Sequence, residues 1–193
     1  MIKSEDCVYT GCYCEENVYK FIEKYSDEFD EVYAVFISNP RQQCVIWCQQ
    51  KSEEPDVRPV CWDYHVVAVA RKSSETYVFD FDTTLEFPCP LALYASQSFK
   101  PIASAIPPGW VQFALLTGHY FRPVKGSDFL ETFSSDRSHM IDKSSGHFLS
   151  DPPNYDPILK PHLGHNLMDF LDFENNSLPG KWLDYNNFLE FFN

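Results

Sequence analysis

The chain has 193 residues, 44% of them hydrophobic, which is enough for one folded domain with a substantial core and excludes a disordered chain. It contains 28 acidic and 15 basic residues, and this net charge of −13 argues against nucleic acid as a partner, because phosphate binding needs a basic surface. No apolar run approaches the roughly 18 residues that span a bilayer, so we expect no membrane partner. The odd number of cysteines, seven, and the lack of a visible secretion signal indicate a reduced intracellular compartment.

The first predicted element is a helix from Cys14 to about Tyr25. The apolar residues Val18, Phe21 and Ile22 follow at helical spacing, and Cys14 lies four residues before Val18 on the same inward face. A thiol at a helix N-terminus feels the positive end of the helix dipole, which favours the thiolate. Cys14 is therefore the candidate nucleophile, although a free cysteine is also a common buried core residue.

Short apolar runs after this helix predict strands. The predicted strands span residues 32–38, 43–48, about 62–70 and about 75–82, and a polar loop spans residues 49–59. Residues 71–74, between the last two strands, are typical of a hairpin loop.

The register of this hairpin decides which residue faces His65. If opposed residue numbers add to 145, His65 faces Asp80 on one side of the sheet; if they add to 147, it faces Asp82. A register of 146 places Phe81 opposite and leaves the histidine without a carboxylate. The residues alone leave the register open.

The second half of the chain is less regular. Short helices are expected near Pro90 and near Asp128, and residues 183–192 are expected to form a closing helix. Residues 134–157 are rich in serine, aspartate and proline and predict a long surface loop of the kind that is often functional. No repeat or low-complexity linker is present, so we expect residues 1–193 to form a single catalytic domain.

A cysteine, a histidine and an aspartate in the order Cys14, His65, Asp80 suggest a thiol acyl-transfer enzyme. A carboxylate that binds one ring nitrogen of His65 fixes its tautomer and leaves the other nitrogen facing the thiol. A transglutaminase-like acyltransferase or a cysteine protease would share this triad. The alternative outside enzymology is an acidic adaptor in which the three residues are structural.

A structural zinc site is a weaker alternative. Cys7, Cys12 and Cys14 have C-x4-C-x-C spacing, and Cys44 and Cys48 have C-x3-C spacing, so no pair of C-x2-C knuckles exists. The histidines show no H-E-x-x-H arrangement, and no nucleotide-binding glycine loop is present. We expect neither a metal nor a cofactor.

Several segments resemble one known family closely. These segments, in chain order, are Cys12-Tyr13-Cys14-Glu15-Glu16-Asn17, Trp62-Asp63-Tyr64-His65-Val66 and Ser135-Asp136-Arg137-Ser138-His139-Met140. The chain resembles the protein N-terminal glutamine amidohydrolases, which are marked by the Trp-Asp-Tyr-His-Val motif. The family removes the side-chain amide of an N-terminal glutamine in proteins and peptides, leaving glutamate and ammonia, and feeds the Arg/N-degron pathway.

The resemblance implies an α+β fold of the papain/transglutaminase-like kind, with an N-terminal cysteine-bearing helix packed on an antiparallel sheet. It assigns the nucleophile to Cys14, the histidine to His65 and the aspartate to Asp80, which favours the 145 register. It implies a monomer in the cytoplasm, with the nucleus as a further expected location, whose partners are substrates that begin with glutamine.

Such a substrate presents a free α-amine that the enzyme must recognise, because internal glutamines should be spared. An acidic contact is expected, and the candidates are Glu15, Glu16, Asp63 and Asp82. The backbone N–H of Cys14 is the expected donor to the oxyanion.

Overall fold

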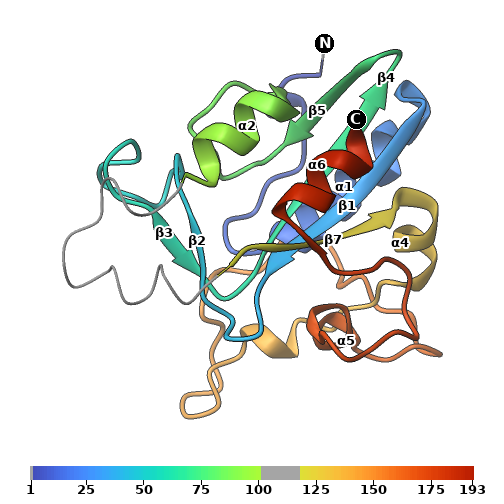
Figure 1. The fold of residues 1–193 in the computed structure, drawn as a ribbon. Helices are drawn as coiled ribbons and strands as arrows, with labels where there is room; N and C mark the ends of the chain where they lie inside the picture. Colours follow the sequence, from blue (N-terminus) through green and yellow to red (C-terminus); the bar gives the residue numbers. More distant parts are fainter. Residues whose placement is uncertain (1, 101–117) are drawn as a thin grey trace.

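The computed structural model describes residues 2–100 and 118–193, and one antiparallel sheet organises them (Figure 1). The strand order is β6-β5-β4-β1-β7-β8, and all neighbouring strands are antiparallel. The strands are β1 (Glu31–Ser38), β4 (His65–Lys72), β5 (Glu75–Phe79), β6 (Cys89–Pro90), β7 (Tyr120–Lys125) and β8 (Leu183–Asp184). The short strands β2 (Cys44–Ile46) and β3 (Val60–Trp62) pair with each other in a separate ribbon. With its helices, the chain belongs to the α+β class, as predicted.

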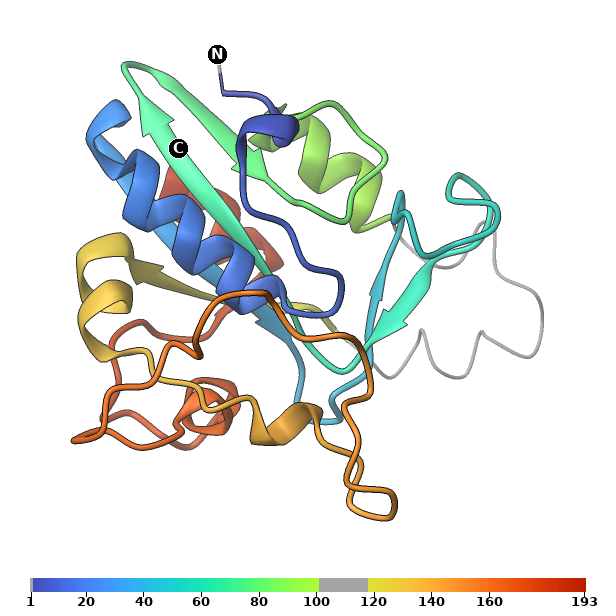
Figure 2. The ribbon, with the colours of Figure 1, turned by 180° about the vertical axis from the view of Figure 1, so that it is seen from behind.

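Helices cover both faces of the sheet (Figures 1 and 2). On one face lie α1 (Cys14–Tyr25), α4 (Gly126–Thr132) and α5 (Leu167–Leu171), and on the other lie α2 (Leu91–Ser98) and α6 (Tyr185–Phe192). Three short 3-10 turns complete the described elements: η1 (Ser4–Asp6), η2 (Ser26–Glu28) and η4 (Ser138–Met140).

The central strands are apolar on both sides because each side has its own helical cover. In β1, Phe36 packs into the cluster of α1 whereas Val35 packs into the cluster of α2 and α6. Val66 and Val67 of β4 divide in the same way. Successive side chains of a strand point to opposite faces, so a continuous apolar run is what a strand between two helical layers requires.

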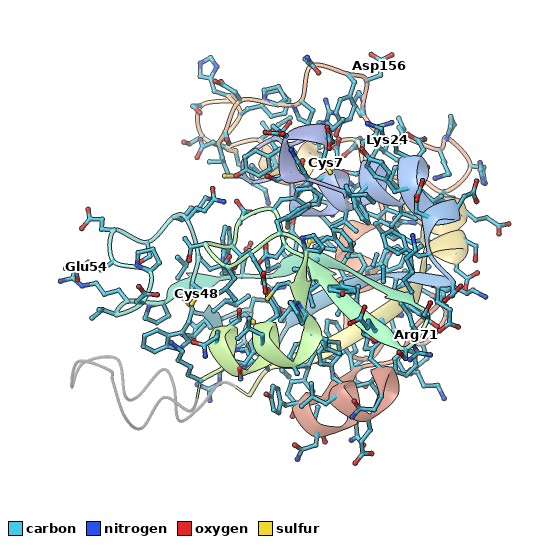
Figure 3. The ribbon with its side chains drawn as sticks, turned by 90° about the horizontal axis from the view of Figure 1, so that it is seen from above. Cys7, Lys24, Cys48, Glu54, Arg71 and Asp156 are labelled. Carbon is cyan, nitrogen blue, oxygen red and sulfur yellow. The ribbon has the colours of Figure 1, made fainter. Side chains whose placement is uncertain are left out.

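The segment before α1 runs back along that helix and is held at its C-terminal end. Lys24 Nζ and Tyr25 Oη both donate to the carbonyl of Asp6 at 2.9 Å, and Figure 3 shows Cys7 lying close to Lys24. Glu54 lies at the far end of the loop between β2 and β3 (Figure 3).

Several predicted elements are confirmed. The helix spans Cys14–Tyr25 as expected, the predicted strand 32–38 is β1, and the helices near Pro90 and Asp128 are α2 and α4. The segment 134–157 is a loop apart from η4, and the closing helix is α6, which begins at Tyr185.

Two predictions about the hairpin region are wrong. The strand expected at about 62–70 is interrupted at Asp63 and Tyr64, because Trp62 pairs with Cys44 of the ribbon whereas His65 pairs with Ile37 of the sheet. In the hairpin of β4 and β5, the numbers of opposed residues add to 147, not to the 145 that the resemblance favoured.

The turn explains this register. Lys72 pairs with Glu75 across a two-residue turn, and Ser73 takes a left-handed φ of 57°, a conformation used by tight hairpin turns. The ladder stops at the pair of Ala68 and Phe79, so the chain leaves the sheet just before Asp80.

Candidate active site

Cys14 is the first residue of α1, and a side-chain clamp holds the chain that leads to it. The Thr10 N–H donates to Asn17 Oδ1 at 2.8 Å, and Asn17 Nδ2 donates back to the Thr10 carbonyl at 2.9 Å. Between them Cys12 takes a left-handed φ of 69°, which turns the chain into the helix. The Cys14 amide lies in the first turn, where helix N–H groups have no partner within the helix.

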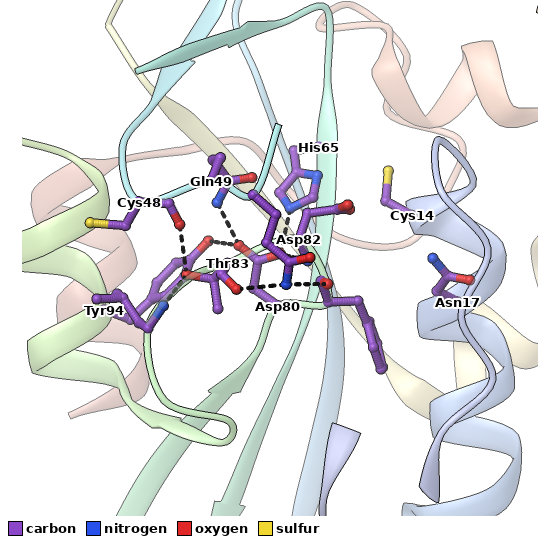
Figure 4. A network of polar contacts seen from close by, with 12 residues as sticks. Cys14, Asn17, Cys48, Gln49, His65, Asp80, Asp82, Thr83 and Tyr94 are labelled. Atoms are coloured by element: carbon purple, nitrogen blue, oxygen red, sulfur yellow. Dashed lines mark hydrogen bonds and ion pairs between the residues drawn. The ribbon is translucent and has the colours of Figure 1, made fainter. Parts of the chain in front are cut away.

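His65 and Asp80 form a buried hydrogen-bonded pair. His65 Nε2 lies 2.8 Å from Asp80 Oδ1, and both side chains are fully buried. Asp80 Oδ1 also accepts from the Asp82 N–H at 2.9 Å, while Oδ2 accepts from Gln49 Nε2 at 2.9 Å and from Tyr94 Oη at 2.8 Å. Figure 4 shows these donors converging on the one carboxylate.

These contacts set the charges of the pair. Burial by itself would raise the pKa of Asp80, but His65 and the hydrogen bonds from Gln49 and Asp82 outweigh it and lower that pKa. Burial by itself would lower the pKa of His65, yet the Asp80 carboxylate raises it above its ordinary value. The pair therefore favours an ionised aspartate beside a histidine that gains a proton readily.

His65 reaches Asp80 even though the register is 147. Asp80 would lie opposite Val67, two residues along β4 from His65 on the same face, and the chain turns after Phe79 so that its carboxylate bends towards the ring. Asp82, the residue that the register places opposite His65, instead accepts a hydrogen bond from Tyr9 Oη at 2.7 Å.

The thiol of Cys14, at the start of α1, lies on the side of the His65 ring that faces away from Asp80 (Figure 4). The backbone of Val66, the residue after His65, is close enough to the thiol to lower its pKa slightly, against the larger effect of burial. His65 Nδ1 is buried without a hydrogen-bond partner in the described part of the chain, and Figure 4 shows the ring on the side of Cys14. The structure thus brings together all three residues that the sequence singled out.

The protonation state of Cys14 differs from the one that its helix position suggests. Burial raises the pKa of the thiol well above its ordinary value, and the negative charges of Glu15 and Asp82 raise it further. The helix position alone therefore does not set the charge of this thiol, and burial favours its neutral form. A neutral thiol beside a readily protonated histidine remains able to attack if the proton moves to His65 as the bond forms.

A cavity of about 380 Å³ opens onto Cys14. Its lining includes Cys14, Trp62, Asp63, Tyr64, Asp82 and His139. A larger cavity of about 750 Å³ lies between α2, α6 and β5, but no cysteine or histidine lines it.

Several residues of the site were not assigned a role by sequence reasoning. Trp62 stacks on the His65 ring at 5.0 Å between centroids, and Lys51 Nζ lies 4.5 Å from the centre of the Trp62 ring on the indole face. Gln49 and Tyr94 hold Asp80 from a loop and from α2. No local pattern marks the last two, because their role depends on contacts 31 and 14 residues away along the chain.

The same region contains a set of potential metal ligands. One ligand atom each of His65, Asp80 and Asp82 lies within 4.8 Å of the others, and among residues 2–100 and 118–193 this is the one such group found. It contains no cysteine, and all seven cysteines are free thiols, so the cysteine-based zinc alternative finds no support in the described residues. The hydrogen bond between His65 and Asp80 accounts for the proximity of this pair without an ion.

A buried cysteine beside a histidine that a carboxylate orients is the arrangement used by cysteine-dependent hydrolases of amides. Residues 9–192 match the profile of the N-terminal glutamine amidase family. The chain is 39% identical over 191 residues to the protein N-terminal glutamine amidohydrolase of Danio rerio, covering 96% of this chain and 89% of that protein. The chain therefore belongs to the N-terminal glutamine amidase family.

Two further relatives that are N-terminal glutamine amidohydrolases also match over most of the chain. The protein N-terminal glutamine amidohydrolase of Homo sapiens is 41% identical over 173 residues, which cover 87% of this chain and 79% of that protein. That of Drosophila melanogaster is 35% identical over 197 aligned positions, covering 98% and 90%. Where the structure describes the chain, none of its helices has the length and apolar character needed to cross a membrane.

Proposed function

We propose that this protein hydrolyses the side-chain amide of an N-terminal glutamine in proteins and peptides, producing N-terminal glutamate and ammonia and so feeding the Arg/N-degron pathway. The family match along residues 9–192 supports the substrate. The observation that carries the chemistry is that Cys14 lines a cavity and lies beside the buried pair of His65 and Asp80.

In the first half of the reaction, the Cys14 sulfur attacks the amide carbon of glutamine while its proton passes to His65 Nδ1. The carbonyl oxygen gains the negative charge and accepts from the Cys14 N–H at the start of α1, the expected oxyanion donor. When the carbonyl reforms, the C–N bond breaks, and the imidazolium gives its proton to the leaving nitrogen, which departs as ammonia. An acyl-thioester on Cys14 remains.

In the second half, water replaces ammonia. His65 takes a proton from the water as its oxygen attacks the thioester carbon, and then returns a proton to the departing Cys14 sulfur. Asp80 holds the ring orientation through both steps and stabilises the imidazolium, because its carboxylate is buried and accepts from His65 Nε2. The products are glutamate and the free thiol.

Five further statements belong to this proposal. The helix that bears Cys14 on an antiparallel sheet fits the papain/transglutaminase-like kind of fold, and residues 1–193 act as a single catalytic domain. We propose a monomer located in the cytoplasm and the nucleus. No metal or cofactor takes part in the steps above.

Ammonia release from matched peptides tests the proposal. A peptide that begins with glutamine should release ammonia rapidly, and matched peptides that begin with asparagine, carry an acetylated N-terminus or hold glutamine internally should release little. Equal release from free and acetylated glutamine peptides would instead favour a general glutaminase. Incorporation of an added amine in place of water would indicate a transglutaminase-like acyltransferase, and no release from any peptide would favour the adaptor alternative.

A further inference from the structure

Four acidic residues near the cavity were candidates for the contact with the substrate α-amine, and the structure separates them. Glu16 is fully buried but neutralised, because Arg137 donates to both of its oxygens at 2.8 Å. Asp82 is bound to Tyr9 Oη. Asp63 is exposed, and its Oδ1 accepts from a backbone N–H.

Glu15 differs from these three because it is fully buried and has no arginine or lysine partner among the described residues; its one nearby basic group is His139, which is a cation only when protonated. Its Oε2 accepts from Tyr64 Oη at 3.1 Å and lies 3.6 Å from the Cys14 sulfur. Its Oε1 lies 3.3 Å from His139 Nε2, yet neither of these two atoms makes a well-aligned hydrogen bond within the described residues. A buried carboxylate with an unmatched oxygen is costly, so its presence beside the nucleophile calls for a function.

The two unpartnered atoms suit one cationic nitrogen. Because Glu15 Oε1 and His139 Nε2 are 3.3 Å apart, a single nitrogen can lie about 2.9 Å from both, which is hydrogen-bonding distance. An ammonium group offers three donors, and a carboxylate oxygen and a neutral imidazole nitrogen both accept. His139 and Tyr64 line the cavity and lie against the fully buried Glu15 carboxylate, so an ammonium group that enters from the cavity must displace the side chains that cover it.

We propose that Glu15 and His139 form the binding site for the α-ammonium group of the substrate's N-terminal residue. The inference rests on the proposed function, because it places the amine of the same glutamine whose amide meets Cys14. The amide carbon and the α-nitrogen of glutamine are separated by four bonds. With the ammonium held at Glu15, beside the sulfur, this length brings the carbonyl to Cys14.

The same geometry gives the preference for glutamine over asparagine a physical cause. Asparagine is shorter by one methylene, so its carbonyl stops more than about 1 Å short when the ammonium is anchored. A misplacement of about 1 Å can cost on the order of 100-fold in rate. The anchor therefore selects both a free terminus and the longer side chain.

The test pairs two enzymes with two substrates. One substrate is a glutamine-initiated peptide, and the other is its des-amino analogue, in which hydrogen replaces the α-amine. The wild-type protein should prefer the amine by roughly 100-fold in kcat/KM, the scale of a hydrogen-bonded charge in a buried site. In Glu15→Gln this preference should fall below roughly tenfold, because the amine substrate loses rate while the analogue does not.

Asp63→Asn is the matched control, since it removes a carboxylate from the same cavity and should leave the preference intact. His139→Ala, at a partly exposed position, should reduce the preference as well and serves as the test if Glu15→Gln does not fold. An equal loss on both substrates in these variants would overturn the proposal and assign Glu15 a structural role. A loss of preference in Asp63→Asn alone would place the amine at Asp63. Failure of the wild-type protein to release ammonia from the glutamine peptide would instead refute the proposed function.

Discussion

Replacing Asp80 by asparagine should slow turnover by about 100-fold rather than the roughly 10⁴-fold seen when a triad aspartate becomes an amide that misplaces the histidine tautomer. Asparagine has the shape of aspartate, but one oxygen becomes an NH₂ donor. Four hydrogen-bond donors surround the carboxylate, so the outcome depends on which of them can become an acceptor for the new NH₂ group.

The structure fixes the orientation of that amide. At the Oδ1 position stands the backbone N–H of Asp82, which can only donate, so the amide oxygen must remain there and continue to accept from His65. At the Oδ2 position, Tyr94 can rotate its hydroxyl, and Gln49 can turn its amide because its own Oε1 has no partner in the described residues. The tautomer and orientation of His65 are therefore retained.

What is lost is the negative charge. Hydrogen bonds to a charged group are roughly twice as strong as neutral ones, and the carboxylate also stabilises the imidazolium that forms during attack. A loss of about 100-fold corresponds to about 2.7 kcal/mol in the barrier. The pKa of His65 should also fall in this variant, because burial lowers it and the Asp80 charge is the largest effect that opposes burial, with Asp82 contributing less.

The assay is the pH dependence of kcat/KM for ammonia release from a glutamine-initiated peptide. In Asp80→Asn the acid limb should move to lower pH, since His65 loses its proton at a lower pH. Asp82→Asn is the control, because Asp82 makes no hydrogen bond to His65, and it should cost less than about tenfold. A loss of 10⁴-fold, an unmoved acid limb, or a larger effect in Asp82→Asn would each refute this reasoning.

Three further predictions concern the nucleophile and the loop beside it. Cys14→Ser should keep the fold and retain less than about a tenth of the activity, because a serine hydroxyl is a far weaker nucleophile in this setting; greater retention would exclude Cys14 as the nucleophile. Arg137→Met should lower the free energy of unfolding in urea by about 3–5 kcal/mol, since it leaves the buried Glu16 charge unpaired. Lys20→Met, which removes a surface pair, should cost less than about 1 kcal/mol, and similar losses in both variants would contradict the argument. Alkylation of Cys14 by iodoacetamide should be slow at neutral pH and accelerate towards alkaline pH, because burial raises the thiol pKa. Glu15→Gln should speed alkylation at a given pH by removing a negative charge, and a rate that is already maximal at pH 7 would show a depressed pKa instead.

Elements specified by neighbouring residues were predictable from the sequence. The helix that begins at Cys14 has apolar residues at a spacing that only a helix gathers on one face, and β1 is a continuous apolar run. β7 was not predicted because Arg122 and Pro123 interrupt its pattern. Arg122 is buried there only because backbone carbonyls from residues 170–179 accept from its guanidinium, and no local signal announces them.

For the site, the sequence by itself determined the identity of Cys14 and His65 as candidates and limited the carboxylate to Asp80 or Asp82. The tertiary structure decided between those two, and it did so against the register, because the chain leaves the ladder after Phe79. It also set the directions in which the pKa values of these groups shift, because the shifts depend on burial and on partners distant in sequence. Periodicity records which face of an element is inward, whereas pKa values and hydrogen-bond partners arise only when separate elements pack together.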